Sequence, residues 1–423
     1  MLLIRNAYLI DPASGTEGIR DILIRDGYFA AVGTSLEAPA GTPCIDAGGL
    51  TAAPGLIDTH SHFRDPGFTY KEDIHTGALA AARGGYTSVI LMANTSPAVD
   101  SPAVLADILA RGRKEAVRIY SCANVTAGMR GLQLADLPAL AAAGAAGFTD
   151  DGLPIMDAAL LRTAFTAARG LGLPVSLHEE DKTMISQNGV NGGGTAAKAL
   201  GLAGAPREAE ISMIERDLAI AVETGAPVCI QHISTAEGVE LVRQARQKNP
   251  DIHAEATPHH FSLTEDAVLR KGTLAKVNPP VRTENDRLAI IRGLQDGTID
   301  LIATDHAPHA ASEKEKPFVQ APSGMIGLET ALGLALRELV QPGCLTMMQM
   351  LACLTVNPAR FYHLPAGEVR VGAPADLVLF DPDAEWEVTA PFASKSDNSP
   401  FIGEKLPGVI RYTICRGEVA YKQ

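Results

Sequence analysis

Apolar and polar residues alternate along both ends of the chain, which predicts β-strands there. Near the N-terminus the run Asp21-Ile-Leu-Ile-Arg alternates in this way and a turn follows at Arg25-Asp-Gly. The same texture returns after residue 364, for example in Ala375-Asp-Leu-Val-Leu-Phe-Asp. Neither end is long enough to bury a core alone. We therefore expect residues 1–52 and 365–423 to form one small β-sandwich together.

Between these ends, over residues 53–364, short runs rich in Val, Ile and Leu alternate with alanine-rich stretches such as Gly77-Ala-Leu-Ala-Ala-Ala-Arg. This alternation is typical of βα units around a parallel sheet. Eight units over about 310 residues predict a (β/α)8 TIM barrel, an α/β fold whose chemistry lies at the C-terminal ends of the strands. The eight predicted strands are residues 55–63, 88–94, 119–125, 146–151, 175–179, 228–234, 253–259 and 300–306.

The first predicted strand carries two histidines, His60 and His62, near its end. Alternate residues of a strand point to the same side, so both imidazoles can reach one metal ion. Two alternate histidines can equally be half of a buried strand face, and the pattern alone leaves both readings open. Arg64 and an Asp-Pro-Gly turn follow directly, which leaves a cation beside the histidines. A metal beside an arginine suits a small anionic substrate.

Four further predicted strands also end in potential ligands. A histidine at one strand end is more often a capped or core residue than a ligand, but five such ends in one barrel are hard to obtain by chance. Four histidines and two carboxylates can hold two divalent ions, with one carboxylate bridging, and the imidazole content favours zinc. Two ions sharing a hydroxide would supply a nucleophile at neutral pH. The residues at these four ends include Asp150, Asp151, His178, His232, Asp305 and His309.

Composition narrows the class of partner. The 36 Lys and Arg residues against 49 Asp and Glu residues give a formal net charge of −13, which argues against nucleic acid and anionic membranes. The six cysteines form no C-x-x-C pair, so neither a zinc ribbon nor a disulfide framework is implied. The N-terminus lacks a signal-peptide pattern, and no uncharged run reaches membrane-spanning length. We expect a soluble cytoplasmic protein with reduced thiols.

Several motifs resemble the amidohydrolase superfamily over nearly the whole chain, and within it class I, bacterial-type dihydroorotases. The superfamily motifs are Pro54-Gly-Leu-Ile-Asp-Thr-His-Ser-His, Ala303-Thr-Asp-His-Ala-Pro-His and Gly372-Ala-Pro-Ala-Asp-Leu-Val-Leu-Phe-Asp. The dihydroorotase motifs are His62-Phe-Arg-Asp-Pro-Gly, Met92-Ala-Asn-Thr, Phe148-Thr-Asp-Asp-Gly, Val277-Asn-Pro-Pro-Val-Arg and Thr304-Asp-His-Ala-Pro-His. The resemblance implies a metal-bearing barrel with a β-sandwich from both termini. It also implies reversible cyclisation of N-carbamoyl-L-aspartate to (S)-dihydroorotate and water, in de novo pyrimidine (UMP) biosynthesis.

The resemblance further implies a role for each matching residue. His60 and His62 would bind a first zinc ion, His178 and His232 a second, and Asp151 would bridge them, whereas sequence physics cannot choose between Asp150 and Asp151. Asp305 would contact the first metal and act as general base and acid. The metal ligands so implied are His60, His62, Asp151, His178, His232 and Asp305. The substrate-binding residues so implied are Arg64, Asn94 and His309 at the substrate carboxylate, Asn278 at the ring, and Ser323 and Gly324 in the lid.

Two departures from the family pattern concern fine substrate contacts. The family commonly has Met-Pro-Asn-Thr-Arg where this chain has Met92-Ala-Asn-Thr-Ser, and Ala-Pro-Phe-Gly where this chain has Ala321-Pro-Ser-Gly. The altered positions are Ala93, Ser96 and Ser323, while Asn94 is kept. The polar segment 310–324 around the second departure is either a solvated connection or a lid over the substrate.

The remaining histidines and the strand cysteines are interpreted as structural. His259 and His260, at the end of the seventh predicted strand, are expected to support the site without binding metal. The residues expected at surface or core positions are His75, His253 and His363, and those expected as small buried apolar groups are Cys122 and Cys229.

The rival functions are another cyclic amidohydrolase and a non-catalytic scaffold. Dihydropyrimidinase, hydantoinase and allantoinase have, in the family picture, a carboxylated lysine on the fourth strand, and residues 146–151 contain no lysine. Arg64 also favours a substrate with a free carboxylate. A dihydroorotase-like scaffold of aspartate transcarbamoylase should have lost metal ligands, and all six candidates are present. Association with that transcarbamoylase, a homodimer, and one versus two zinc ions per subunit all stay open.

Overall fold

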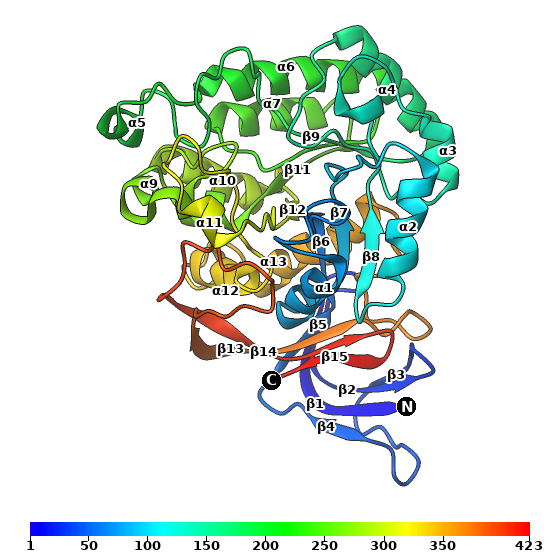
Figure 1. Cartoon of the computed structure of the whole chain (residues 1–423). Helices are drawn as coiled ribbons and strands as arrows, with labels where there is room; N and C mark the ends of the chain where they lie inside the picture. The colour runs from blue at the N-terminus through cyan, green and yellow to red at the C-terminus, as the bar shows by residue number, and fades with distance from the viewer.

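The computed structural model describes residues 1–423, and strands from both ends of the chain share one sheet at the lower end of Figure 1. The strand order is β15-β14-β13-β5-β1-β2-β3, with β4 paired beside β1. The two ends meet where β13 pairs antiparallel with β5. The strands are β1 (Leu2–Asp11), β2 (Thr16–Arg25), β3 (Tyr28–Gly33), β4 (Cys44–Asp46), β5 (Thr51–Pro54), β13 (Leu377–Glu387), β14 (Lys405–Cys415) and β15 (Glu418–Lys422).

This terminal sheet has an apolar core of its own. Ile4 and Ile22 from the N-terminal strands pack with Leu377 and Leu379 from β13 in a cluster separate from the main core. Burying apolar side chains from both ends against one another supplies the stability that either end would lack alone. The pairing expected between the two ends is therefore present, as a single hydrogen-bonded sheet.

The middle of the chain forms two parallel sheets, ordered β6-β7-β8 and β12-β11-β10-β9. Isolated parallel bridges link them, because Phe148 pairs with both Ala123 and Val175, and Ser61 pairs with His306. The strands are short and fully or largely buried, as expected of parallel strands covered on both faces. They are β6 (Leu56–Ser61), β7 (Tyr86–Leu91), β8 (Arg118–Ser121), β9 (Val175–Leu177), β10 (Val228–Ile230), β11 (Ile252–Ala256) and β12 (Leu301–Ile302).

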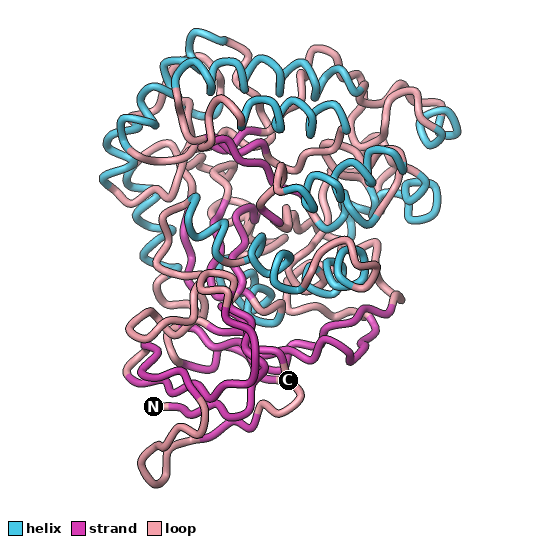
Figure 2. The backbone as a smooth tube through the Cα atoms, turned by 180° about the vertical axis from the view of Figure 1, so that it is seen from behind, coloured by secondary structure: helices cyan, strands magenta, loops and turns pink.

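Helices surround these parallel strands. Figure 2 shows the terminal sheet at the opposite end of the molecule from most of these helices, with both chain ends beside it. The apolar faces of the helices and the strands share the largest buried core. No helix combines the length and the apolar character needed to cross a membrane. The helices are α1 (Ile74–Arg83), α2 (Pro102–Gly112), α3 (Leu137–Ala142), α4 (Ala158–Leu171), α5 (Thr195–Leu200), α6 (Arg207–Thr224), α7 (Ala236–Arg246), α8 (Pro258–Ser262), α9 (Asp266–Lys271), α10 (Glu284–Asp296), α11 (Ala311–Lys314), α12 (Ala331–Ala335), α13 (Met347–Leu354) and α14 (Val356–Phe361), with short η1 (Ala127–Met129), η2 (Gly272–Ala275) and η3 (Leu336–Val340).

Several predicted strands are shorter in the structure, since those predicted at 119–125, 228–234 and 300–306 end at Ser121, Ile230 and Ile302. Residues 146–151 form no strand beyond the bridges at Phe148, although backbone bonds such as Thr149 N–H to Ala123 O follow the ladder. Beyond that point the Asp150 carboxylate accepts the backbone N–H groups of Val125 and Thr126. The seventh strand stops at Ala256, because the Thr257 side chain caps α8, which starts with a proline. His259 and His260 therefore lie on a short helix and not at a strand end.

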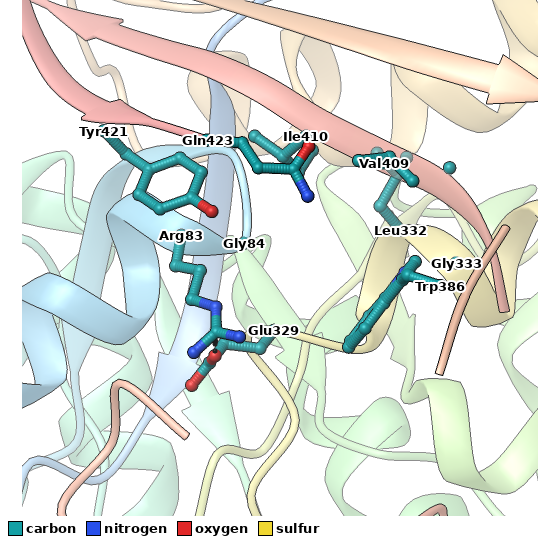
Figure 3. A pocket seen from close by; sticks show the side chains of 11 residues that line it. Arg83, Gly84, Glu329, Leu332, Gly333, Trp386, Val409, Ile410, Tyr421 and Gln423 are labelled. Carbon is teal, nitrogen blue, oxygen red and sulfur yellow. Dashed lines mark ion pairs between the residues drawn. The ribbon is translucent and has the colours of Figure 1, made fainter. Parts of the chain in front are cut away.

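A pocket of about 470 Å³ lies where the terminal sheet meets the end of α1 (Figure 3). Trp386 and Tyr421 flank it, and Arg83 Nε lies 3.1 Å from Glu329 Oε2 within it. Neither of the two side-chain groups that could hold a metal ion lies here. This pocket is a seam between the sheet and the helices, and the candidate chemistry lies elsewhere.

Candidate metal centre and substrate pocket

Two groups of buried side chains that could each hold a metal ion meet at the C-terminal ends of the parallel strands. Within each group the candidate ligand atoms lie within 4.8 Å of one another. Asp151 belongs to both groups, which is the geometry of a bridging carboxylate. The first group is His60, His62 and Asp151, and the second is Asp151, His178 and His232.

Spacing within the two groups suits ligands around shared ions. Neighbouring ligand atoms on a tetrahedral ion with bonds of about 2.0–2.1 Å stand roughly 3.3 Å apart. The contacts of Asp151 lie at or slightly above that value, longer than good hydrogen bonds. Asp151 Oδ1 lies 3.5 Å from His60 Nε2, 3.7 Å from His178 Nδ1 and 3.9 Å from His232 Nε2, and Oδ2 lies 3.5 Å from His62 Nε2.

Charge around His60 also fits a bound cation. Its Nε2 atom is buried and has no hydrogen-bond partner, while Nδ1 lies 2.5 Å from Glu255 Oε1. Burial lowers the pKa of His60, but the charges of Glu255, Asp151 and Asp305 outweigh burial and raise this pKa well above its ordinary value. Several buried carboxylates thus surround one imidazole, and a divalent cation is the natural counter-charge for them.

Asp305 stands at the edge of the first group. Its Oδ1 atom lies 3.0 Å from His62 Nε2 and 3.6 Å from His60 Nε2. Burial raises the pKa of Asp305, but the neighbouring histidines outweigh burial and lower it, so the carboxylate is ionised and able to accept a proton. Asp305 (φ 46°), His232 (φ 33°) and Arg64 (φ 59°) all have left-handed backbone conformations, a strain that clusters at functional sites.

Three hydrogen-bond partners orient the histidines, and sequence reasoning missed two of them, Glu255 and Glu180. His60 donates from Nδ1 to Glu255, and His178 donates from Nε2 to Glu180 Oε2 at 3.0 Å, which leaves the opposite ring nitrogens facing Asp151. Burial raises the pKa of Glu180, but His178 outweighs burial and holds it at about 2. The available signal for Glu255 was a charged residue inside the buried strand β11.

The third partner is Asn94, predicted as a substrate contact. Its amide accepts from His62 Nδ1 at 3.0 Å and donates to Asp151 Oδ2 at 3.1 Å. Asp150, by contrast, points away from both metal groups and holds the backbone of the segment after β8. Of the two adjacent aspartates, the structure brings only Asp151 to the histidines.

A pocket of about 570 Å³ opens beside the metal groups. All the residues predicted to bind substrate line it, and so does Lys182, which was not predicted. The Asn278 side-chain oxygen has no hydrogen-bond partner and is available to a ligand. The predicted substrate-binding residues in the lining are Arg64, Asn94, Asn278, His309, Ser323 and Gly324.

Positive charge collects at one side of this pocket. The Arg64 guanidinium donates from Nε to Pro308 O at 3.3 Å and has no carboxylate partner. His309 donates from Nε2 to Ser323 O at 2.8 Å and accepts from Lys71 Nζ at 3.3 Å. Burial and the charges of Arg64, Lys71 and Lys314 lower the pKa of His309 to about 2, so this imidazole is neutral. A bound anion would give the Arg64 guanidinium the negatively charged partner that it lacks.

Comparison with known proteins agrees with this geometry. The model of the Amidohydrolase family matches residues 51–420. Dihydroorotase from Clostridioides difficile (strain 630) is 48% identical over 421 residues, and dihydroorotase from Clostridium acetobutylicum is 49% identical over 423 residues, each match covering 100% of both chains. The solved L-hydantoinase (dihydropyrimidinase) from Arthrobacter aurescens is 27% identical with a TM-score of 0.88, covering 99% of this chain and 95% of that one. The chain therefore belongs to the amidohydrolase family and, within it, to the bacterial-type dihydroorotases.

Proposed function

We propose that this chain is a dihydroorotase, which interconverts N-carbamoyl-L-aspartate and (S)-dihydroorotate in pyrimidine biosynthesis. The observation that carries the proposal is a buried cluster of metal-type ligands beside a pocket that contains an unpaired arginine. Dihydroorotate is a cyclic amide with a free carboxylate, so it needs both parts of this site. The full-length match to dihydroorotases from Clostridioides difficile and Clostridium acetobutylicum supports the same reaction.

The fold part of the proposal is that residues 53–364 close into a (β/α)8 barrel, with residues 1–52 and 365–423 forming the β-sandwich. The bridges of Phe148 to Ala123 and Val175, and of Ser61 to His306, support closure, since they join the two parallel sheets at both seams. In such a barrel the C-terminal strand ends face one mouth, where the metal groups lie.

The cofactor part of the proposal is zinc. His60, His62 and Asp151 would hold one ion, and Asp151, His178 and His232 would hold a second. Imidazole and carboxylate donors in groups of three favour zinc and leave room for substrate or water. When bound, such ions polarise a carbonyl and lower the pKa of water.

The catalytic role that we assign to Asp305 is proton transfer. In hydrolysis its carboxylate accepts a proton from the attacking water and returns it to the ring nitrogen as the amide C–N bond breaks. In cyclisation the same carboxylate takes the proton from the ureido nitrogen and gives it to the departing water. Its ionised state suits the step in which it accepts a proton, and its place beside His62 puts it at the candidate metal centre in both directions.

Substrate recognition is assigned to the cationic side of the pocket. Arg64 would bind the substrate carboxylate through its planar fork, with Asn94 and His309 beside it, while Asn278 would contact the ring. Ser323 and Gly324 would close the pocket from the 310–324 segment. His309 is neutral and can therefore donate a hydrogen bond without adding charge.

The likeness to L-hydantoinase favours one second candidate, a dihydropyrimidinase or hydantoinase. Dihydrouracil is dihydroorotate without the carboxylate, so the two substrates form a matched pair. Loss of one charge-assisted bond of about 1.5–3 kcal/mol predicts a preference for dihydroorotate in kcat/KM of roughly 10- to 100-fold or more. Equal hydrolysis of dihydrouracil, or of hydantoin, by the zinc-loaded protein would overturn the assignment of the substrate.

A further inference from the structure

A five-residue segment of the C-terminal end, residues 394–398, contacts the loops around the substrate pocket. It lies between β13 and β14 and belongs to the orange-red loop beside α11 and α12 in Figure 1. We call these residues the strap. Most of the C-terminal end builds the terminal sheet. The strap, by contrast, contacts the loops around the substrate pocket.

One side of the strap holds the loop that carries Arg64. The buried carboxylate of Glu72 accepts hydrogen bonds from the Ser394 hydroxyl and from the Lys395 N–H at 3.1 Å. Ser396 Oγ donates to Lys71 O at 2.7 Å. Lys71 in turn donates to His309, so these contacts bear on the loop of Arg64 and on the segment of His309.

The other side of the strap holds the segment that carries His309. Asn398 is 3% exposed, and its Oδ1 atom accepts from the His309 N–H at 3.0 Å. Its Nδ2 atom donates to Ala307 O at 3.1 Å and to Gly324 O at 3.2 Å. One amide therefore joins the two ends of the 308–324 segment.

The middle of that segment is held by different groups. Lys314 Nζ donates to Pro322 O and Gly324 O, both at 2.9 Å, and Lys276 Nζ donates to Phe318 O and Ala321 O, both at 2.7 Å. These bonds brace the interior of the segment, but they do not reach Ala307 or His309. Two other bonds join the same ends, from His309 Nε2 to Ser323 O at 2.8 Å and from Ala307 N–H to Met325 O at 2.8 Å. Asn398 adds a side chain from outside the segment that bonds to the backbone of both His309 and Gly324.

We propose that Asn398 is a positioning residue for substrate binding, because its amide holds the backbone of His309 beside that of Gly324 at the edge of the pocket. The inference rests on the proposed function, in which His309 lies beside the substrate carboxylate and Gly324 helps to close the pocket. Asn398 itself does not line the pocket. Its effect on substrate is therefore expected in KM more than in kcat.

The test is Asn398→Asp in the full chain, with Asn398→Ser as a second variant in case the carboxylate impairs folding. Aspartate keeps the acceptor for His309 N–H but loses both donated bonds and faces two carbonyl oxygens. We expect KM for dihydroorotate to rise about tenfold, as for the loss of two ordinary hydrogen bonds, while kcat changes by less than about threefold. Amide hydrogen exchange without substrate should accelerate in residues 307–326 and not elsewhere.

Asn249→Asp is the matched control. Asn249 is 5% exposed, donates from Nδ2 to Ala221 O and Ala226 O at 3.1 and 3.0 Å, and accepts from Asp251 N–H at 3.1 Å. It thus makes the same three kinds of bond as Asn398, but beside the C-terminal end of α6. This variant should lose comparable stability with KM unchanged.

Three results would overturn the inference. They are an unchanged KM, acceleration of exchange throughout the chain, and a KM effect equal to that of Asn249→Asp. The proposed function is judged separately by Arg64→Lys, since that variant tests the carboxylate pocket without touching the strap. If exchange is faster in residues 307–326 but KM is unchanged, Asn398 holds this segment in place but does not control substrate binding.

Discussion

Replacing Glu255 by glutamine should weaken binding of the metal held by His60. Glu255 is 1% exposed, and its Oε1 atom accepts from His60 Nδ1 at 2.5 Å while Oε2 accepts from Thr59 at 3.2 Å. Glutamine has nearly the same shape, and its side-chain oxygen can still accept a hydrogen bond from His60 Nδ1. It lacks the charge that makes the imidazole a stronger ligand and that attracts the cation through the ring.

The expected loss of metal-binding free energy follows from the distance between Glu255 and the ion and from their charges. An ion on the far nitrogen of the ring would stand on the order of 7 Å from the Glu255 carboxylate. A unit charge acting on a divalent ion over that distance contributes roughly 1 kcal/mol in a water-like medium and roughly 5 kcal/mol at an effective dielectric constant of 20. Loss of such a partner typically reduces metal affinity by about 10- to 100-fold, or about 1.4–2.7 kcal/mol, which lies within this interval.

The assay is competitive zinc titration against a chromophoric chelator, with metal content measured after dialysis. We expect Glu255→Gln to weaken one site by about 10- to 100-fold and to leave the other nearly unchanged. Glu180→Gln should affect the site of His178 instead. Glu329→Gln, which removes a buried carboxylate in the pocket of Figure 3, is the control and should leave both sites intact. Wild-type zinc affinity in Glu255→Gln would refute the reasoning.

Three further predictions test the proposed roles. Asp305→Asn should lower kcat by roughly 10²–10⁴ in both directions with metal content near wild type, and activity close to wild type in either direction would disprove proton transfer by Asp305. Arg64→Lys keeps the charge but loses the planar fork, so KM for dihydroorotate should rise by roughly tenfold or more, and an unchanged KM would remove Arg64 from the carboxylate site. Because the pKa of His309 is lowered to about 2, the imidazole does not gain a proton between pH 8 and pH 5; KM profiles of the wild type and His309→Asn should therefore have the same shape there, and a wild-type inflection near pH 6.5 that the variant lacks would contradict this.

Much of the candidate site could be predicted because its signals are local. His60 and His62 share a strand face through their spacing, and Asp151, His178, His232 and Asp305 follow apolar runs whose ends gather at one edge of a parallel sheet. Thr257-Pro258 was also a local signal, a helix cap followed by proline, and it was missed in favour of the apolar run before it. The fourth strand was predicted too long because the Asp150 carboxylate, and not a backbone carbonyl, accepts the N–H groups of Val125 and Thr126.

The sequence by itself determined the alternation of elements, the polar character of the strand ends and the β-strand texture of both chain ends, because periodicity reports which face of an element is buried. Only the tertiary structure decided that Glu255 holds His60, although the two are 195 residues apart. It brought Asp151 and not Asp150 to the histidines, a choice that the family resemblance implied but that the residues alone left open, and it set Asn398 of the C-terminal end against the backbone of His309. Such contacts join residues distant in the chain through single hydrogen bonds, and a single hydrogen bond imposes no period on the residues around it.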